Sequence, residues 1–548
     1  MAALVADRIV DSLYAYGIHS VFGVHGANSE DLFAAALTSA PYRAGDLSVT
    51  VAKHEFGAGA MADGAARMTG APAALVTTSG GGAMNAVPAL AESYESRVPV
   101  LAVIGSAPRP GEGRGGFQDM CTAPLTIDAP AVFRGVTGFS ARVTSPEMLE
   151  PALDGARAAL ERGLPAALLV PKDVQQSPAT SPVPTTRGAR PDPVVPPEVV
   201  ELLARARRPL LLLGEAASRA RLGTTLAPLL AATGAVVATT PNGRDACPAN
   251  AVFVGVSGVM GHPSTARAAA EADAIVVLGG RLSATDRAGL DPYLDRAVHI
   301  DADPPLRPVA LHVQAQDLSA WTTALVKAVA EATARVCRPW TDAAPEPLRP
   351  EQPADIGTTC ADAVAAVATA LPPEALVFAD AGNAGAAAVH RIPVSAGHRF
   401  LVALGMGGMG YGIAAAVGAS IATRRRAVVV AGDGAFYMHG MELHTAVQYD
   451  APVTLVVLNN DAHGMCVTRE NRFQPGVPGV NTFRHTDIGA GLAAMFPSLT
   501  VRTASTPEGA ATAARDLLDG RTGPNVLVVD TDPREIPPFA PLLPQEVS

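Results

Sequence analysis

Short apolar runs recur along the whole chain and alternate with longer amphipathic stretches. Residues 4–16 and 30–37 repeat apolar positions with the spacing of a helix, whereas the short runs have few polar interruptions, as buried parallel strands do. The runs that we expect to form strands are 20–23, 73–76, 100–104, 167–170, 209–213, 235–239, 274–278, 376–379, 427–431, 453–458 and 526–529. This alternation predicts an α/β fold of doubly wound parallel sheets, whose ligands bind beyond the carboxyl ends of the strands.

Two stretches that concentrate Pro among polar residues, 176–197 and 339–353, have the composition of interdomain linkers. The 548 residues are also too many for a single hydrophobic core. We therefore predict three domains, at 1–178, 190–338 and 355–548, each with its own doubly wound parallel sheet.

Composition narrows the class of protein. Hydrophobic residues make up 48% of the chain and charged residues 17%, which is typical of a globular protein. The formal charge is −10 and no basic run occurs, so nucleic acid is not an expected partner. The apolar runs are far shorter than the ~20 residues of a membrane span, and the N-terminus lacks the basic segment of a signal peptide. The five cysteines have neither metal-ligand nor redox-pair spacing, so we expect a cytoplasmic protein with reduced thiols.

Unusual polar residues follow two neighbouring predicted strands in the last third of the chain. Gly432-Asp433-Gly434 comes after the run 427–431, and Asn459-Asn460 comes after 453–458. A right-handed crossover brings both strand ends to one edge of the sheet, where Asp433 and Asn460 can converge. A carboxylate and an amide oxygen suit Mg²⁺ when phosphate oxygens complete its coordination, and glycines let backbone amides approach those phosphates. Each fragment alone is more often an ordinary turn or a helix cap, but the pair at this spacing favours a metal–phosphate site.

The pair of motifs resembles the thiamine diphosphate motif of the acetolactate synthase and pyruvate decarboxylase superfamily. The resemblance implies a metal held by the side chains of Asp433 and Asn460 and by the backbone carbonyl of Ala462. It also implies that the third domain binds the diphosphate and that the cofactor contacts Asp380, Gly382, Asn383, Ala384, Gly432, Gly434, Ala435, Gly464 and Met465. The family often has Ser where Ala435 stands, so one hydroxyl contact is expected to be missing.

Glu55 is the expected activating carboxyl group. It ends a strand-like run and precedes the Gly- and Ala-rich segment 56–68, and the family has its activating Glu in the same His-Glu-x-Gly-Ala context. A carboxyl group at pyrimidine N1′ favours the cofactor tautomer that removes the proton from thiazolium C2. A lone Glu here would more often be a helix N-terminal charge. The loop 77–85 resembles the family's loop beside the pyrimidine, which implies cofactor contacts by Thr78, Gly82 and Asn85 and makes the first domain the pyrimidine-binding one.

The segment 405–410, Gly-Met-Gly-Gly-Met-Gly, has a second interpretation. It lies between a predicted strand at 400–404 and a predicted helix at 411–422, which is the pattern of a dinucleotide fingerprint with Asp433 as the ribose-binding acid. A nicotinamide oxidoreductase is therefore the rival from local pattern, although it leaves Asn460 and Glu55 unexplained. The thiamine family implies instead that Met409 supports a bent cofactor and that the Gly407 carbonyl accepts from the pyrimidine amine.

Similarity to acetolactate synthase extends over essentially the whole chain. It implies a pyruvate-like 2-oxo acid donor, a carbonyl acceptor, carboligation, and a homodimer or homotetramer whose active sites combine two subunits. A 2-oxo acid decarboxylase and an acyloin lyase are the alternatives. A non-catalytic relative is a third, against which the complete set of Glu55, Asp433 and Asn460 argues.

Four residues are candidates for substrate contact. His25 stands where acetolactate synthases usually have Pro and benzaldehyde lyase has His, and it could relay protons or simply cap a helix. Phe117 and Gln118 resemble the family's Phe-Gln-Glu substrate loop. Arg469 replaces a Trp that usually faces the substrate, and it could hold a carboxylate or phosphate or face solvent.

The resemblance leaves FAD open. The segment 277–286 is similar to the part of acetolactate synthase that holds a non-redox FAD in a central Rossmann-like domain, but many relatives keep this fold empty.

Overall fold

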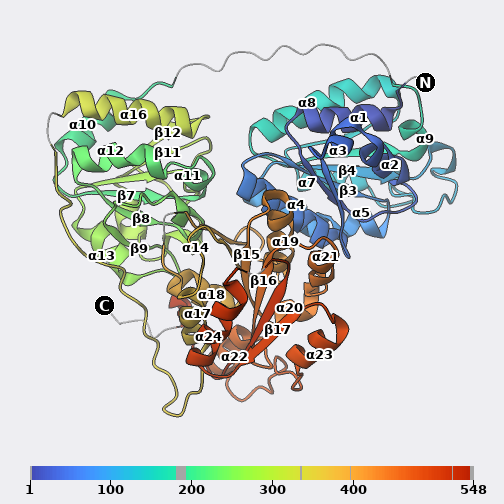
Figure 1. The fold of residues 1–548 in the computed structure, drawn as a ribbon. Coiled ribbons are helices and arrows are strands. Elements are labelled where there is room, and N and C mark those ends of the chain that lie inside the picture. The colour runs from blue at the N-terminus through green and yellow to red at the C-terminus, as the bar shows by residue number, and fades with distance from the viewer. Residues whose placement is uncertain (1–2, 180–192, 334–335, 395–396, 521, 543–548) are drawn as a thin grey trace.

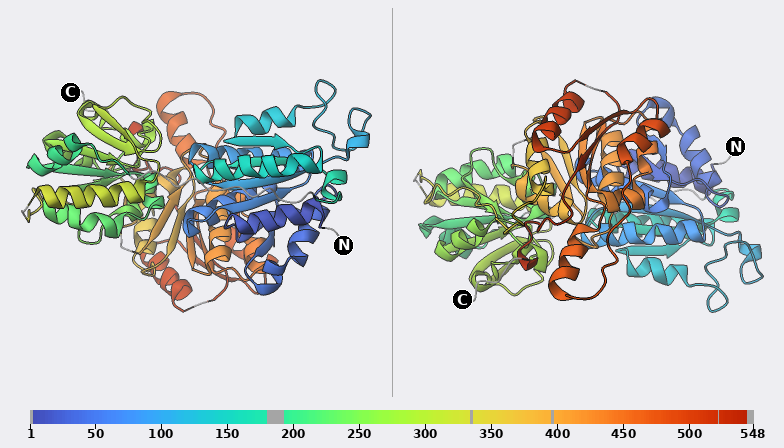
Figure 2. Two further views of the ribbon diagram at one scale, coloured as in Figure 1. Left: turned by 90° about the horizontal axis from the view of Figure 1, so that it is seen from above. Right: turned by 90° about the horizontal axis from the view of Figure 1, so that it is seen from below.

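Three parallel sheets of six strands each organise the computed structural model, which describes residues 3–179, 193–333, 336–394, 397–520 and 522–542 (Figure 1). Each sheet lies within one of the three predicted domains, and helices cover both of its faces (Figures 1 and 2). The predicted α/β fold is therefore confirmed. The first predicted linker falls mainly on 180–192, outside the described residues, and residues 336–359 contain neither helix nor strand. The domain boundaries themselves stay predictions.

The first sheet has the strand order β2-β1-β3-β4-β6-β5. Its strands are β1 (Ser20–Gly23), β2 (Ser48–Val51), β3 (Ala73–Thr77), β4 (Val100–Ser106), β5 (Phe139–Arg142) and β6 (Ala166–Pro171). Its helices are α1 (Val5–Ala15), α2 (Glu30–Thr38), α3 (Ala40–Ala44), α4 (Glu55–Thr69), α5 (Gly81–Asn85), α6 (Val87–Glu95), α7 (Ala129–Gly135), α8 (Leu149–Glu161) and α9 (Lys172–Gln175).

The second sheet has the order β12-β11-β10-β7-β8-β9. Its strands are β7 (Pro209–Leu213), β8 (Val236–Thr239), β9 (Phe253–Val256), β10 (Ala274–Leu278), β11 (Ala297–Asp301) and β12 (Leu311–Gln314). Its helices are α10 (Pro197–Arg205), α11 (Glu215–Arg219), α12 (Gly223–Thr233), α13 (Pro263–Glu271), α14 (Ala284–Arg287), α15 (Asp291–Leu294) and α16 (Leu318–Ala332).

The third sheet, of order β14-β13-β15-β16-β18-β17, repeats the topology of the first. Its strands are β13 (Leu376–Ala379), β14 (Arg399–Val402), β15 (Ala427–Gly432), β16 (Val453–Asn459), β17 (Thr500–Ala504) and β18 (Asn525–Asp530). Its helices are α17 (Cys360–Ala368), α18 (Asn383–Arg391), α19 (Tyr411–Thr423), α20 (Asp433–His439), α21 (Glu442–Gln448), α22 (Gly464–Phe473), α23 (Ile488–Met495) and α24 (Pro507–Leu518).

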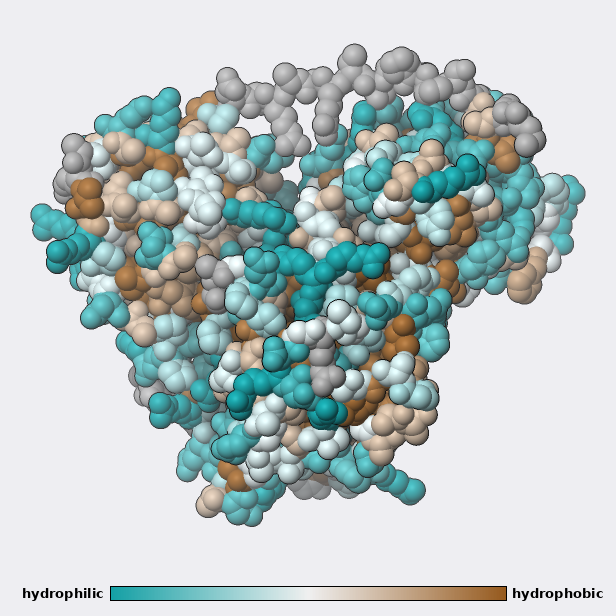
Figure 3. All heavy atoms as spheres, in the orientation of Figure 1, coloured by the Kyte–Doolittle hydropathy of each residue, from teal (hydrophilic) through white to brown (hydrophobic). Residues whose placement is uncertain are grey.

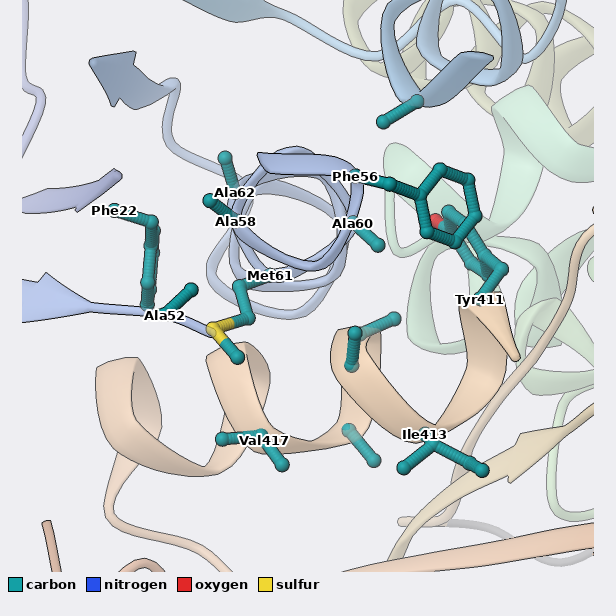
Figure 4. Close-up of a cluster of buried hydrophobic side chains, with 14 of the residues drawn as sticks. Phe22, Ala52, Phe56, Ala58, Ala60, Met61, Ala62, Tyr411, Ile413 and Val417 are labelled. Carbon is teal, nitrogen blue, oxygen red and sulfur yellow. The ribbon is translucent and has the colours of Figure 1, made fainter. Parts of the chain in front are cut away.

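The first and third domains share a continuous core in which α4 packs against α19. Figure 4 shows Met61 of α4 pointing toward α19 and Tyr411 of α19 near Phe56, whereas Ile413 and Val417 lie on the side of α19 away from α4. The two backbones approach closely, because a Cβ atom at Gly64 would meet Ala415 and one at Gly418 would meet Met61. The first domain is thus fixed against the third by small residues at the contact.

Within the described part of the chain, no helix combines the length and the apolar character that a bilayer crossing requires. On the face shown in Figure 3, hydrophilic residues occur on all three lobes and hydrophobic residues form separate patches.

Candidate active site

A cavity lies at the carboxyl ends of β13, β15 and β16, beside the point where the strand order of the third sheet reverses. This is the position at which doubly wound sheets bind ligands. The predicted cofactor residues that line it are Gly382, Asn383, Ala384, Met409, Gly432, Asp433, Gly434, Ala435, Asn460, Ala462, Gly464 and Met465. Cys360, Leu458 and Cys466 also line it and had no signal in the sequence, because thiols and an apolar side chain carry no phosphate-binding pattern.

Asp433 and Asn460 converge on one point of this cavity. The backbone N–H of Ala462 donates to Asp433 Oδ2 and to Asn460 Oδ1, each at 3.2 Å. Burial raises the pKa of Asp433 to about 6, a shift that a bound cation would oppose. One carboxylate, one amide oxygen and a nearby backbone carbonyl form a set of hard oxygen donors, so the residues present fit Mg²⁺.

Several groups around the cavity are suited to an anion. The N-termini of α18 and α22 open into it at Gly382–Asn383 and at Gly464. Both polar atoms of the Asn383 side chain and Nδ1 of His463 are buried without a hydrogen-bond partner. A Cβ atom at Gly434 would lie 2.5 Å from His463 Nδ1, so the glycine keeps this space open. Buried polar atoms normally have partners, and a diphosphate would supply them.

Two predicted cofactor residues of the third domain, Asp380 and Gly407, do not line the cavity. Asp380 Oδ1 accepts from the Gly410 amide and Oδ2 from the Gly412 amide, both at 2.8 Å, so this carboxylate fixes the start of α19. Burial raises the pKa of Asp380 to about 6. Gly407 lies in the loop before α19 with a φ of +65°, a conformation that favours glycine.

Glu55 lies in a second cluster, in the first domain, and is not among the residues that line the cavity. It is the first residue of α4, is 8% exposed, and its Oε2 accepts a 3.0 Å hydrogen bond from Asn85 Nδ2. Gly82 borders Glu55 Oε1 and Thr78, since a Cβ atom there would lie 2.9 Å and 3.0 Å from them. The structure thus brings together the four residues predicted to surround the pyrimidine.

Gln118 joins this cluster through two residues that the sequence did not single out. Ser79 Oγ donates to Gln118 Oε1 at 3.1 Å and accepts from Asn28 Nδ2 at 2.6 Å. Phe117 is 80% exposed, and the exposed His25 ring contacts Phe33 with 5.3 Å between ring centroids. Gln118 itself has a φ of +59°, a strained conformation for a residue with a side chain.

A surface hollow adjoins the cavity and shares Cys466 with it. Arg469, Glu470, Phe473, Gln474 and Asn481 also line the hollow. Arg469 is exposed, and its guanidinium carbon lies 5.5 Å from the centre of the Phe473 ring. Glu470 Oε1 instead accepts from Asn481 Nδ2 at 2.6 Å. Arg469 therefore presents positive charge next to the cofactor cavity.

The glycine-rich segment 405–410 is not part of a simple dinucleotide unit. In such a unit the strands before and after the helix are neighbours, whereas β13 lies between β14 and β15. The strand and the helix predicted on either side of the segment are present, but the strand order that the oxidoreductase interpretation requires is not.

The second domain forms a cavity with residues from both other domains, at the segment considered for FAD. It is lined by the carboxyl-bearing side chains of Glu95, Glu215 and Asp286 and by Arg281. Arg281 is paired with Glu95, and burial raises the pKa of Asp286 to about 6. Three carboxyl groups and an already paired guanidinium fit the diphosphate of a flavin dinucleotide poorly, so we assign no role to FAD.

Comparison with known proteins decides the family. The chain is 30% identical over 483 residues to the protein named "Probable 2-ketoarginine decarboxylase AruI" of Pseudomonas aeruginosa, covering 84% of this chain and 82% of that one. It matches three families in order: the thiamine pyrophosphate enzyme N-terminal TPP binding domain at 4–126, the central domain at 197–313, and the C-terminal TPP binding domain at 380–529. The chain belongs to the thiamine pyrophosphate enzymes.

Other members of this family show the same extent of similarity. The chain is 28% identical to the large subunit of acetolactate synthase isozyme 1 of Escherichia coli, over 89% of this chain and 88% of that one. It is 27% identical to sulfoacetaldehyde acetyltransferase of Castellaniella defragrans, over 84% and 81% of the two chains. A solved structure described as "X-ray structure of a putative thiamin diphosphate-dependent enzyme isolated from Mycobacterium smegmatis" matches with a TM-score of 0.75 at 23% identity, covering 97% of this chain and all of the other. The prediction of an acetolactate synthase-like thiamine diphosphate enzyme acting on carbon–carbon bonds is confirmed at this level.

Proposed function

We propose that this thiamine pyrophosphate enzyme is a Mg²⁺-dependent carboligase that decarboxylates a small 2-oxo acid and transfers the resulting acyl group to a second carbonyl compound. The observation that carries the proposal is the presence of two clusters of the predicted residues, one around Glu55 and one around Asp433 and Asn460. Similarity to an acetolactate synthase and to an acetyltransferase supports transfer as the outcome.

The residues of the two half-sites have distinct tasks. Thiamine diphosphate, when bound, would supply a carbon nucleophile that adds to the carbonyl carbon and a thiazolium ring that accepts the electron pair of the broken carbon–carbon bond. Asp433, Asn460 and the Ala462 carbonyl hold the metal, and Asn383 and the N-termini of α18 and α22 hold the diphosphate. Glu55 shares a proton with pyrimidine N1′, and Asn85 keeps its carboxylate oriented while the other oxygen stays free. Gln118, fixed by Ser79, orients the substrate.

The active enzyme is proposed to be a homodimer or a larger homo-oligomer. The cavity for the diphosphate is lined only by residues between Cys360 and Cys466, and Glu55 is absent from its lining. If one cofactor contacts both half-sites, the first domain of a second copy of the chain can complete the binding site. The five free cysteines support a reducing, cytoplasmic setting.

A decarboxylase without obligatory coupling is the second candidate, because the 30% identical relative is named a decarboxylase. Incubation with thiamine diphosphate, Mg²⁺ and a panel of 2-oxo acids, with and without a second aldehyde or ketone, separates the two. Mass spectrometry should detect a hydroxyketone that carries carbon from both compounds. An aldehyde as the sole product would refute carboligation and support the decarboxylase, and an absence of any product would refute both.

We further propose that the hollow beside the cofactor cavity receives an anionic group of a substrate, held by Arg469. In the variant Arg469→Gln, KM for an anionic acceptor should rise about tenfold while KM for a neutral acceptor changes little. The control is Arg484→Gln, since Arg484 is exposed but does not line the hollow. Equal effects on anionic and neutral acceptors would contradict this role of Arg469.

A further inference from the structure

Two buried carboxylates cross the contact between the first and third domains in opposite directions. Glu442, on α21 of the third domain, reaches the segment before α4, and Glu92, on α6 of the first domain, reaches the loop before α19. Both residues are 2% exposed. Each binds two successive backbone amides of the other domain, which is the pattern of a specific clamp rather than of a surface ion pair.

Glu442 fixes the residues directly before Glu55. The Lys53 amide lies 3.1 Å and 3.2 Å from its two carboxylate oxygens, and the His54 amide donates to Oε1 at 3.0 Å. Thr445 Oγ1 donates to Glu442 Oε2 at 2.7 Å and orients it. The absence of a side chain at Gly57 provides the room, because a Cβ atom there would overlap Glu442 Oε1. The position at which α4 begins, and so the position of Glu55, depends on a residue of the third domain.

Glu92 fixes the residues directly before Gly407–Met409. The Gly405 amide donates to Glu92 Oε1 at 3.2 Å and the Met406 amide to Oε2 at 2.5 Å. Ser96 Oγ donates to Oε1 at 2.8 Å, in the place that Thr445 takes for Glu442. Met409, three residues further along, lines the cofactor cavity. The position of this loop depends on a residue of the first domain.

We propose that Glu442 and Glu92 are reciprocal positioning residues, through which each domain of one chain holds in place the cofactor-contacting segment of the other. The proposal rests on the proposed function in so far as Glu55 and Met409 contact the cofactor. Two buried carboxylates accept from four backbone amides of the opposite domain, so loss of either charge should loosen one segment and leave the other ordered.

The test compares Glu442→Gln and Glu92→Gln, each of which keeps the size of the side chain but places an amide group against a backbone N–H. Hydrogen–deuterium exchange of the cofactor-free protein reports on the two segments independently of turnover. Glu442→Gln should speed exchange at 51–57 about tenfold and leave 403–410 unchanged, and Glu92→Gln should do the reverse. With cofactor, kcat should fall about tenfold in both variants while KM for the 2-oxo acid stays within about twofold.

Asp273→Asn is the matched control, because Asp273 accepts from the successive amides of Arg207 and Arg208 in the second domain, remote from either segment. It should alter neither exchange at 51–57 and 403–410 nor kcat. If a Gln variant does not fold, Thr445→Val and Ser96→Ala weaken the same clamps and should give the same segment-specific pattern at smaller amplitude.

Uniform acceleration of exchange over the whole chain, or unchanged exchange in both segments, would overturn the proposal and leave the two residues a general role in stability. Product formation by the wild-type enzyme tests the proposed function separately, because it does not depend on the exchange pattern of the variants. A segment-specific exchange pattern in a protein that forms no product would preserve the clamps and refute the carboligase.

Discussion

Asn85 Nδ2 donates a 3.0 Å hydrogen bond to Glu55 Oε2, which leaves Oε1 beside the space that Gly82 keeps free. One carboxylate oxygen is thus engaged by the protein and the other is available to a ligand. This division of the two oxygens is what a carboxyl group needs if it is to share a proton with a heterocycle while keeping a fixed orientation.

Replacement of Glu55 by Gln should lower kcat by ~10²–10⁴-fold, because the amide cannot share its proton with pyrimidine N1′. Cofactor affinity, measured by isothermal titration calorimetry, should change much less, since the diphosphate and metal contacts lie in the other cluster. Turnover close to that of the wild type would remove Glu55 from the catalytic machinery.

Gly82→Ala should lower activity about tenfold or more, since the added Cβ atom lies 2.9 Å from Glu55 Oε1 and would shift the carboxylate. Gly81→Ala provides the matched control, because a Cβ atom at Gly81 meets nothing within 4 Å. The measurement is the initial rate of each variant, and equal losses for the two substitutions would contradict a specific role of Gly82 beside Glu55.

Asp433→Asn should abolish the stabilisation that Mg²⁺ and thiamine diphosphate confer together. Ligand at about a hundred times its Kd adds about 2.7 kcal/mol to the free energy of unfolding, which thermal unfolding detects readily. In the wild type, EDTA should remove this stabilisation and excess Mg²⁺ should restore it. Asp461→Asn is the control, because Asp461 pairs with the exposed His485 at 2.9 Å; a loss of the Mg²⁺ effect in that variant too would argue against a specific site at Asp433.

Acid should destabilise the contact between the second and third domains. His390 accepts from the Leu348 amide through Nε2, donates to the Met260 carbonyl through Nδ1, and stacks on His262 with 4.6 Å between ring centroids. Burial, reinforced by the charge of Arg391, lowers the pKa of His390 from 6.5 to about 4. Between these values the unfolded chain binds more protons than the folded one, so stability falls as the pH drops from about 6.5 to about 4, by on the order of 3 kcal/mol.

Denaturant unfolding across this pH range should therefore show a shallower decline for His390→Gln, which has no group that titrates there. Parallel curves for the variant and the wild type would contradict the assignment of the acid sensitivity to His390.

The sequence predicted that the metal-ligand candidates lie together, because both directly follow an apolar strand. Asp433 and Asn460 each stand at the end of a continuous buried run. Because doubly wound sheets bind ligands at the carboxyl ends of their strands, the sequence could place both residues at the binding site. Asn28 and Ser79 could not be found in this way, because their link to Gln118 joins residues 51 and 39 positions apart in the chain.

Three of the strands that the sequence did not predict lack the pattern of a buried parallel strand for physical reasons. β5 and β17 lie at sheet edges and are partly exposed, so they lack a continuous apolar run. β11 is fully buried but contains His299, whose ring bonds to the Gly280 carbonyl, and the polar residue interrupts the apolar pattern. In the sequence, Glu92 and Glu442 resemble ordinary charged residues on helices, because only the fold shows which backbone amides donate to them.

The location of Glu55 and Asp433 in separate half-sites has a genetic consequence. In the proposed dimer, two inactive chains, one carrying Glu55→Gln and the other Asp433→Asn, should complement each other, since the mixed dimer contains one site with both original residues and one with neither. Random reassortment of equal amounts would restore about a quarter of the wild-type sites. Two defective alleles in one cell could thus produce working enzyme that neither produces alone.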